Sequence, residues 1–309
     1  MKKLWQNNGM LLVCALLFLV LSFTVPNFAT VENAKGLTMS VTTVGIVACT
    51  MLFCLAAGDF DLSVGSVVAL AGVVAALTIN KTNSIGLAIA IPVALGFGVG
   101  AVNGFVIARL GINALITTLA TMQIVRGVAR LLADGSSVGI SNEAFGQLGQ
   151  YKLLEFQSPV WVMVLCFIVF GLLLNKTIYG RNTLAIGGNA EAARLSGVNV
   201  ARTKILIFAV QGAVAALAGV LLASRVSSGQ PNTSEGLELQ VISGCVLGGV
   251  SLTGGVGTIS GMIVGVFIMG AVQNAMNLLN IPTFWQAVAS GAILLAAVLL
   301  DKLKNRKSA

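Results

Sequence analysis

Residues 176–204 read KTIYGRNTLAIGGNAEAARLSGVNVARTK and lie between two long apolar segments. The stretch is polar and basic. It sets five basic side chains against the single acid Glu191: Lys176, Arg181, Arg194, Arg202 and Lys204. In membrane proteins, short loops rich in Lys and Arg face the cytoplasm. The stretch therefore predicts a cytoplasmic loop that joins two membrane-spanning helices.

The inner part of this loop, Asn189 to Gly197, predicts a short helix of its own. Asn189 can accept a hydrogen bond from the first turn, Glu191 suits the positive N-terminal end, and Gly197 suits the stop. A rigid, capped helix on the cytoplasmic side indicates a place where another protein docks.

The composition places the whole chain in the membrane. Of its 309 residues, 57% are hydrophobic and only 9% are charged. Several apolar runs are roughly 17–24 residues long, the length that crosses a bilayer as a helix. The runs are continuous and do not alternate with polar residues, which excludes a β-barrel. We expect an all-α polytopic membrane protein that forms a single transmembrane domain over residues 1–309.

The remaining composition excludes several other classes of function. The net charge of +8 comes from basic residues in short tails and loops, so it does not indicate nucleic-acid binding. The chain has no histidine, and its five cysteines lie in apolar runs without a CxxC pair, so neither a metal site nor a disulfide framework is expected. The glycine-rich string GGVGTISG lacks the Lys-Ser/Thr ending of a nucleotide loop. We expect no cofactor on this chain.

The apolar runs predict about ten transmembrane helices, with both chain ends in the cytoplasm. Twelve basic residues fall on the inner side of this arrangement and four on the outer side, which supports the orientation. The outer loops would be 133–158 and 224–236, and the central inner loop 176–204. The expected spans are 10–25, 37–57, 62–79, 85–108, 113–132, 159–174, 205–223, 237–250, 256–279 and 283–300.

Two polar breaks follow apolar runs and precede glycine-bearing helices: residues 58–65 (GDFDLSVG) and 248–255 (GGVSLTGG). Transporters are often built from repeats with helix breaks at matching places, so an internal repeat is possible. The first break carries Asp59 and Asp61. A carboxylate in the membrane is usually functional, which favours a gate or a partner contact. The alternative is that the break lies at the inner membrane face, where Asp61 or Ser63 caps the next helix.

Polar residues within two expected spans are candidates for a transport pathway: Asn113, Thr117 and Thr121 in one, Gln273, Asn274 and Asn277 in the other. Hydroxyl and amide side chains suit an uncharged polyhydroxylated solute, although they can equally join neighbouring helices. Arg126 and Arg130 are expected near the outer face, paired or extending toward the interface. The glycines at 96, 100 and 104 and at 257, 261 and 265 predict close helix packing.

Several stretches resemble one family. GDFDLSVGSVVAL, GRNTLAIGGNAEAARLSGVNVARTK, LLASRVSSGQPNTSEG and VLGGVSLTGGVGTISG are similar to the permeases of monosaccharide ABC importers, the ribose, xylose, galactoside and arabinose group. The stretches MLFCLAAGDFDLSV, INALITTLATMQIVRG and NAMNLLN resemble the arabinose branch. The resemblance runs from the second expected span to the C-terminal tail.

Glu191-Ala192-Ala193-x-x-x-Gly197 resembles the EAA signature of such permeases, although the later Ile-x-Leu-Pro part is missing. The resemblance implies that the helix around it is a cytoplasmic coupling helix for an ATPase. The residues concerned are Asn189, Glu191, Ala192, Ala193, Arg194 and Gly197. It also implies a homodimer, a cytoplasmic ABC ATPase that binds ATP and Mg, a periplasmic sugar-binding protein and a place in the bacterial inner membrane.

The function expected from the sequence is therefore that of a permease subunit in an ATP-driven importer of a monosaccharide, a pentose such as L-arabinose. A stand-alone secondary transporter or facilitator is the alternative. Coupling to an ion would require carboxylates deep in the bundle, and the sequence has only Asp59 and Asp61 as candidates for that role. A membrane-embedded enzyme finds no support, because the chain shows no catalytic dyad and no metal spacing.

Overall fold

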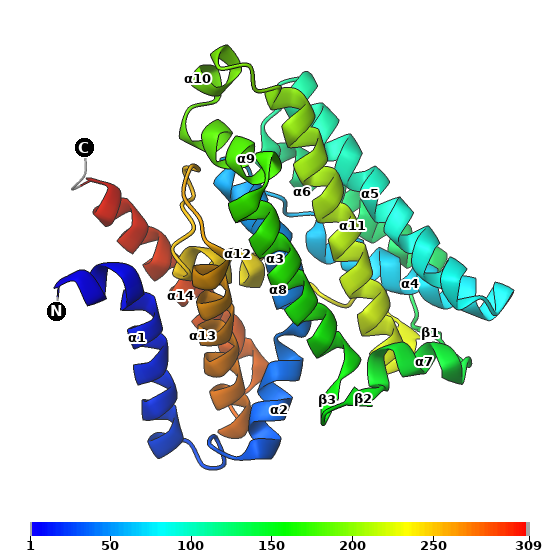
Figure 1. Cartoon of the computed structure of the whole chain (residues 1–309). Helices are drawn as coiled ribbons and strands as arrows, with labels where there is room; N and C mark the ends of the chain where they lie inside the picture. Colours follow the sequence, from blue (N-terminus) through cyan, green and yellow to red (C-terminus); the bar gives the residue numbers. More distant parts are fainter. Residues whose placement is uncertain (1, 307–309) are drawn as a thin grey trace.

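The computed structural model describes residues 2–306 and is a bundle of α-helices with four two-residue strands (Figure 1). Lys307, which belongs to the basic tail counted above, lies outside the described residues. The helices are α1 Lys2–Thr24, α2 Val31–Ser40, α3 Thr42–Ala56, α4 Val64–Thr82, α5 Ile85–Arg109, α6 Ala114–Leu132, α7 Glu143–Gln150, α8 Ser158–Lys176, α9 Ile178–Gly188, α10 Ala190–Leu195, α11 Val200–Val226, α12 Leu237–Leu247, α13 Ile259–Leu278 and α14 Thr283–Arg306. The strands are β1 Val138–Gly139, β2 Lys152–Leu153, β3 Phe156–Gln157 and β4 Ser228–Gly229.

Within residues 2–306, six helices are long and apolar enough to span a membrane: α4, α5, α6, α8, α11 and α13. The pair α2 and α3 adds a seventh candidate, and three shorter apolar helices lie at Gly9–Thr24, Leu237–Leu247 and Thr283–Ala296. Every expected span therefore overlaps an apolar helix of the structure.

The helix expected over 37–57 is broken into two in the structure. The chain becomes helical at Val31, where Thr30 caps the first turn by accepting the Asn33 N–H, and it bends by 45° between α2 and α3. No Pro or Gly lies at the bend. The hydroxyls of Ser40 and Thr42 donate to the carbonyls of Leu37 and Met39, each at 2.8 Å. Hydroxyls that bond back to the preceding turn bend helices.

The centre of the bundle is α11, which packs against α5, α4 and α3. Glycines make the closest approach possible. A Cβ at Gly96 would lie 2.4 Å from the Gly212 carbonyl oxygen, and one at Gly100 would lie 2.0 Å from that of Phe208. The expected glycine packing is thereby confirmed for α5. On α13 the packing is confirmed at Gly261 and Gly265, which press on the C-terminal end of α12. Gly257 lies before α13, and a Cβ there would meet only ordinary contacts.

The bundle has two distinct ends (Figure 1). At one end, α9 and α10 form a helical cap between α8 and α11. At the opposite end lie α7 and the strand pairs β1–β4 and β2–β3, both antiparallel. Residues 133–158 are thus not a simple polar loop: they hold a helix and three short strands. The β1–β4 pair joins this segment to the 224–236 segment, which the sequence did not indicate.

Candidate functional site

The segment quoted first folds as two helices, α9 and α10, and not as one. Thr177 caps α9 by accepting the Gly180 N–H, and Asn189 caps α10 by accepting the Ala192 N–H at 3.0 Å. Gly197 follows α10 with φ of +88°, a left-handed conformation that favours glycine. The caps expected at Asn189 and Gly197 are therefore confirmed.

The α10 helix presents most of its surface to solvent. Only Ala193 is buried against the chain, while Leu195 is 78% exposed. Glu191 and Arg194 form an ion pair along one face, with Oε1 and Nη2 2.6 Å apart, and this hydrogen bond lowers the pKa of the Glu191 carboxyl. The helix is thus stabilised by contacts between its own residues, and the Leu195 side chain remains exposed. These are the properties of a surface that can dock on a partner.

Beneath α9, three backbone segments meet. The Gly255 N–H donates to the Ala56 carbonyl at 2.9 Å, and a Cβ at Gly187 would lie 1.8 Å from that same oxygen. Gly254 packs on Gly187 and on the Gly58 N–H. The two polar breaks noted in the sequence, 58–65 and 248–255, are therefore in contact with each other and with α9. Whether they descend from a repeat stays a prediction.

Asp59 lies in the first break and forms an ion pair with Lys204 of α11, with Oδ2 and Nζ 2.7 Å apart. Only 11% of the Asp59 side chain and 19% of that of Lys204 are exposed. Burial raises the pKa of the Asp59 carboxyl, and the Lys204 charge opposes that rise. The pair ties the break to the start of α11, the helix that follows α10.

Asp61 begins a buried polar chain that crosses three helices. Its carboxylate accepts the N–H and the hydroxyl of Ser63, which precedes α4, at 2.9 and 2.6 Å. The Asn103 amide of α5 donates to the Ser63 hydroxyl at 3.1 Å, and its carbonyl accepts the Thr121 hydroxyl of α6 at 2.6 Å. The N–H that Asp61 accepts belongs to Ser63, the residue before α4, and not to the first turn of that helix, so the choice between cap and gate stays a prediction. The Ser63 side chain makes no capping bond.

Asn103 is a residue that the sequence argument missed. It is fully buried and is an amide in an otherwise apolar span. Such a side chain in a membrane helix must find polar partners, which was the available signal. Its partners, 40 and 18 residues away in the chain, could not be identified from spacing.

The other pathway candidates of α6 have local partners. Asn113 Oδ1 caps α6 by accepting the N–H groups of Leu115 and Ile116, and the Thr117 hydroxyl donates to the Asn113 backbone carbonyl. On α13, Asn274 and Asn33 exchange two amide hydrogen bonds, at 2.9 and 2.8 Å. These contacts leave the pathway role of Asn113, Thr117 and Asn274 a prediction.

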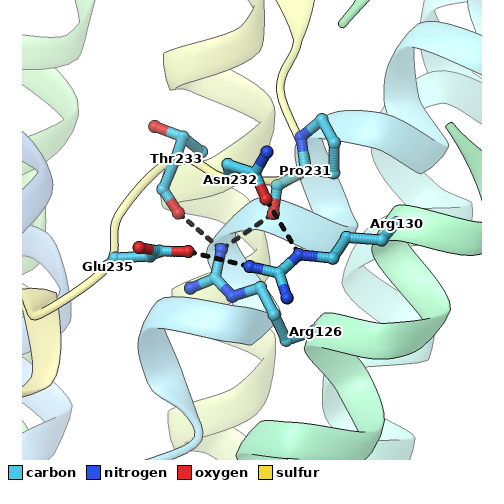
Figure 2. Close-up of polar contacts among 6 residues, drawn as sticks. All are labelled: Arg126, Arg130, Pro231, Asn232, Thr233 and Glu235. Carbon is cyan, nitrogen blue, oxygen red and sulfur yellow. Dashed lines mark hydrogen bonds and ion pairs between the residues drawn. The ribbon is translucent and has the colours of Figure 1, made fainter. Parts of the chain in front are cut away.

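Two arginines of α6 hold the segment that leads into α12 (Figure 2). Arg126 donates through Nη1 to the carbonyls of Pro231 and Thr233, at 2.9 and 2.6 Å. Arg130 donates to Asn232 Oδ1 at 2.9 Å and to Glu235 Oε1 at 3.1 Å. Arg130 is paired as expected. Arg126, at 7% exposure, does not extend toward the interface: it is buried and binds backbone carbonyls.

No set of three or more His, Cys, Asp or Glu within the described part of the chain is placed to hold a metal ion. What the fold defines is a polytopic membrane protein with a capped helical projection at one end and an arginine-anchored segment toward the other.

Comparison with known proteins identifies the class. Residues 33–298 match the family described as branched-chain amino acid transport system / permease component, and the chain belongs to this family. With its apolar helices, it is a multi-pass permease of the bacterial inner membrane.

Individual relatives show which members of this family the chain is most similar to among those compared. The chain is 59% identical to the L-arabinose transport system permease protein AraH of Escherichia coli, over 98% of this chain and 93% of that protein. It is 54% identical to the L-arabinose ABC transporter permease protein AraH of Azospirillum brasilense, over 98% and 90%. The ribose import permease protein RbsC of Escherichia coli is 37% identical over 98% and 96%. No solved structure matches significantly.

Proposed function

We propose that this chain is the permease subunit of an ATP-driven ABC importer for L-arabinose. The choice of L-arabinose as the substrate rests on sequence identity. The chain is 59% identical, over nearly its whole length, to a relative named as an L-arabinose permease, and 37% identical to one named for ribose. The family supports a transport subunit rather than an enzyme, and nothing favours a stand-alone transporter.

The proposed membrane arrangement has ten crossings with both termini in the cytoplasm. It is supported by the six long spans, the bent α2–α3 pair and the three shorter apolar helices. The α12 helix has 11 residues, and at 1.5 Å per residue it is shorter than the roughly 30 Å hydrocarbon core. Segment 248–257 would complete this crossing. Non-helical backbone is tolerated there because it packs against Gly187, Ala56 and α13 instead of lipid.

In this arrangement α10 faces the cytoplasm and is the contact for the ATPase, which binds ATP and Mg itself. A second copy of the chain, with the path along the interface between the copies, and a periplasmic sugar-binding protein complete the proposed importer. The segments 133–158 and 224–236 lie at the end opposite α10, where a binding protein would dock. Asp59, Asp61, Thr121, Gln273 and Asn277 remain candidates for the gate or pathway.

Uptake in cells tests this proposal. A host that lacks its own arabinose permease, but retains the matching ATPase and binding protein, should regain uptake of labelled L-arabinose when it expresses this chain. Ribose should compete weakly. Restored uptake that persists after the ATPase gene is removed would instead favour the stand-alone transporter.

A further inference from the structure

A cavity of about 350 Å³ lies between α12, α13 and α14. It falls within the roughly 300–1,000 Å³ range of small-molecule sites. Its polar lining comes from the three helices and the segment that precedes α12: Glu235, Gln240, Gln273, Thr283, Gln286 and Ser290. Leu239 and Leu294 add apolar surface. Gln273 is the only one of these that the sequence argument singled out.

The side chains that line the cavity are complementary to a neutral, polyhydroxylated ligand. Gln273 Nε2 lies 3.5 Å from the Ser290 hydroxyl, a long hydrogen bond. Gln286 Nε2 donates to Asn277 Oδ1 at 2.7 Å, which leaves its carbonyl oxygen to accept. Among the hydrogen bonds of the described residues, the Gln240 backbone N–H donates to Gly236, and none involves the Gln240 side-chain amide. Amides and hydroxyls both donate and accept, as sugar hydroxyls require.

Charge argues for the same class of ligand. The one ionisable side chain of the lining is Glu235, and its carboxylate pairs with Arg130 at 3.1 Å. Among the described side chains, none that lines the cavity is basic. An anionic solute would meet a carboxylate and no cation, whereas an uncharged sugar meets neutral donors and acceptors. The leucines can contact the C–H face of a sugar ring.

The position suits a temporary stop on a transport path. The cavity begins at Glu235 and Gly236, at the end of the segment that Arg126 and Arg130 anchor (Figure 2). Gln273 of α13 lines it as well. We propose that this cavity is a transient subsite for the transported neutral monosaccharide. The proposal rests on the function proposed above and assigns that function a place in the chain.

A transient site must bind weakly enough to release its ligand. With a Kd of about 1 mM, 10 mM sugar would leave about one tenth of the sites free, by simple mass action. Thiol labelling can measure this. Ser290→Cys and Gln240→Cys place a thiol on α14 and on α12 respectively, each in a Cys14→Ser background, because Cys14 is the one native cysteine that is not buried. Each is purified as the complete importer.

L-Arabinose at 10 mM should slow maleimide labelling of both cysteines about tenfold. L-Arabinonate, which has the same carbon chain with a carboxylate, should not slow it. Ser260→Cys, an exposed position at the start of α13 outside the cavity, is the control and should label at one rate throughout.

Equal rates with and without L-arabinose at both cavity positions, in an importer whose wild-type form transports L-arabinose, would overturn the subsite. Equal protection by L-arabinonate would overturn the neutral ligand class. If the wild-type importer transports no monosaccharide, the function itself is wrong, which is a separate result.

Discussion

Buried polar residues connect helices that are far apart in this sequence. Asn103 joins α5 to Ser63 and Thr121, and Asp59 joins the first break to Lys204. In both cases the partners are protein groups whose loss would leave a buried polar atom unpaired. Such losses cost more than the net value of the bond.

Replacing Asp59 should destabilise the protein through Lys204. The pair is mostly buried, so Asp59→Asn should lower the free energy of unfolding by about 2 kcal/mol, somewhat less than for a fully buried pair. The double variant Asp59→Asn, Lys204→Met should recover most of that loss. Denaturant unfolding in detergent measures both. Losses that simply add would show that the two side chains are not coupled.

Asn103 and Thr121 should be energetically coupled. Asn103→Ala and Thr121→Val each remove one partner of a 2.6 Å hydrogen bond, and a double-mutant cycle should give a coupling of about 1 kcal/mol. Thr118→Val is the control, because the Thr118 hydroxyl donates to the Ala114 carbonyl of its own helix. A cycle of Asn103 with Thr118 as large as that with Thr121 would contradict the assignment.

At the scale of elements, local sequence patterns predicted the positions of the helices well, but they did not predict the contacts between segments that are far apart in the chain. Asn189 and Gly197 mark the ends of α10 because cap and stop act on neighbouring residues. The bend after Ser40 depends on hydroxyl groups that bond backwards, and Ser and Thr are common in straight spans too, so the sequence did not indicate it. The β1–β4 pairing joins segments some 90 residues apart, so it depends on the tertiary arrangement.

The contact of α5 with α11 depends on the absence of a side chain at Gly100. Gly100→Ala would push a methyl group against the Phe208 backbone carbonyl, which cannot rotate away, and should cost about 1–3 kcal/mol. Gly98→Ala, on the same helix, meets nothing within 4 Å and should be neutral or slightly stabilising. Thermal unfolding of the two variants in detergent compares them. Equal melting temperatures would mean that the helices can move apart at little cost.

The α10 helix should transmit the partner ATPase's cycle through its exposed side chains. Leu195→Asp puts a charge on a residue that is 78% exposed, so the chain should fold normally. At an interface it should lower sugar-stimulated ATP hydrolysis and uptake by at least tenfold, equivalent to about 1.4 kcal/mol. Ser196→Ala, at the neighbouring exposed position, is the control. Normal stimulation in the Leu195 variant would remove α10 from the contact.

At the scale of the whole molecule, composition predicted a polytopic helical bundle and the charge distribution predicted its orientation. The candidate site was predicted only in part. The α10 helix follows from a local motif. The cavity between α12, α13 and α14 gathers residues from 235 to 294, and only folding brings them together. Arg126 illustrates the same point. A charged arginine in an apolar span is expected near the outer face of the membrane, but Arg126 is buried because the carbonyls of Pro231 and Thr233 accept its hydrogen bonds.

We expect this chain to move L-arabinose only as part of an ATP-driven importer. Reconstitution into proteoliposomes with the ATPase and the sugar-binding protein tests it most directly. Labelled L-arabinose should accumulate only when ATP and both partners are present, and the chain alone should accumulate none under a proton or sodium gradient. Accumulation by the chain alone, driven by an ion gradient, would contradict the account.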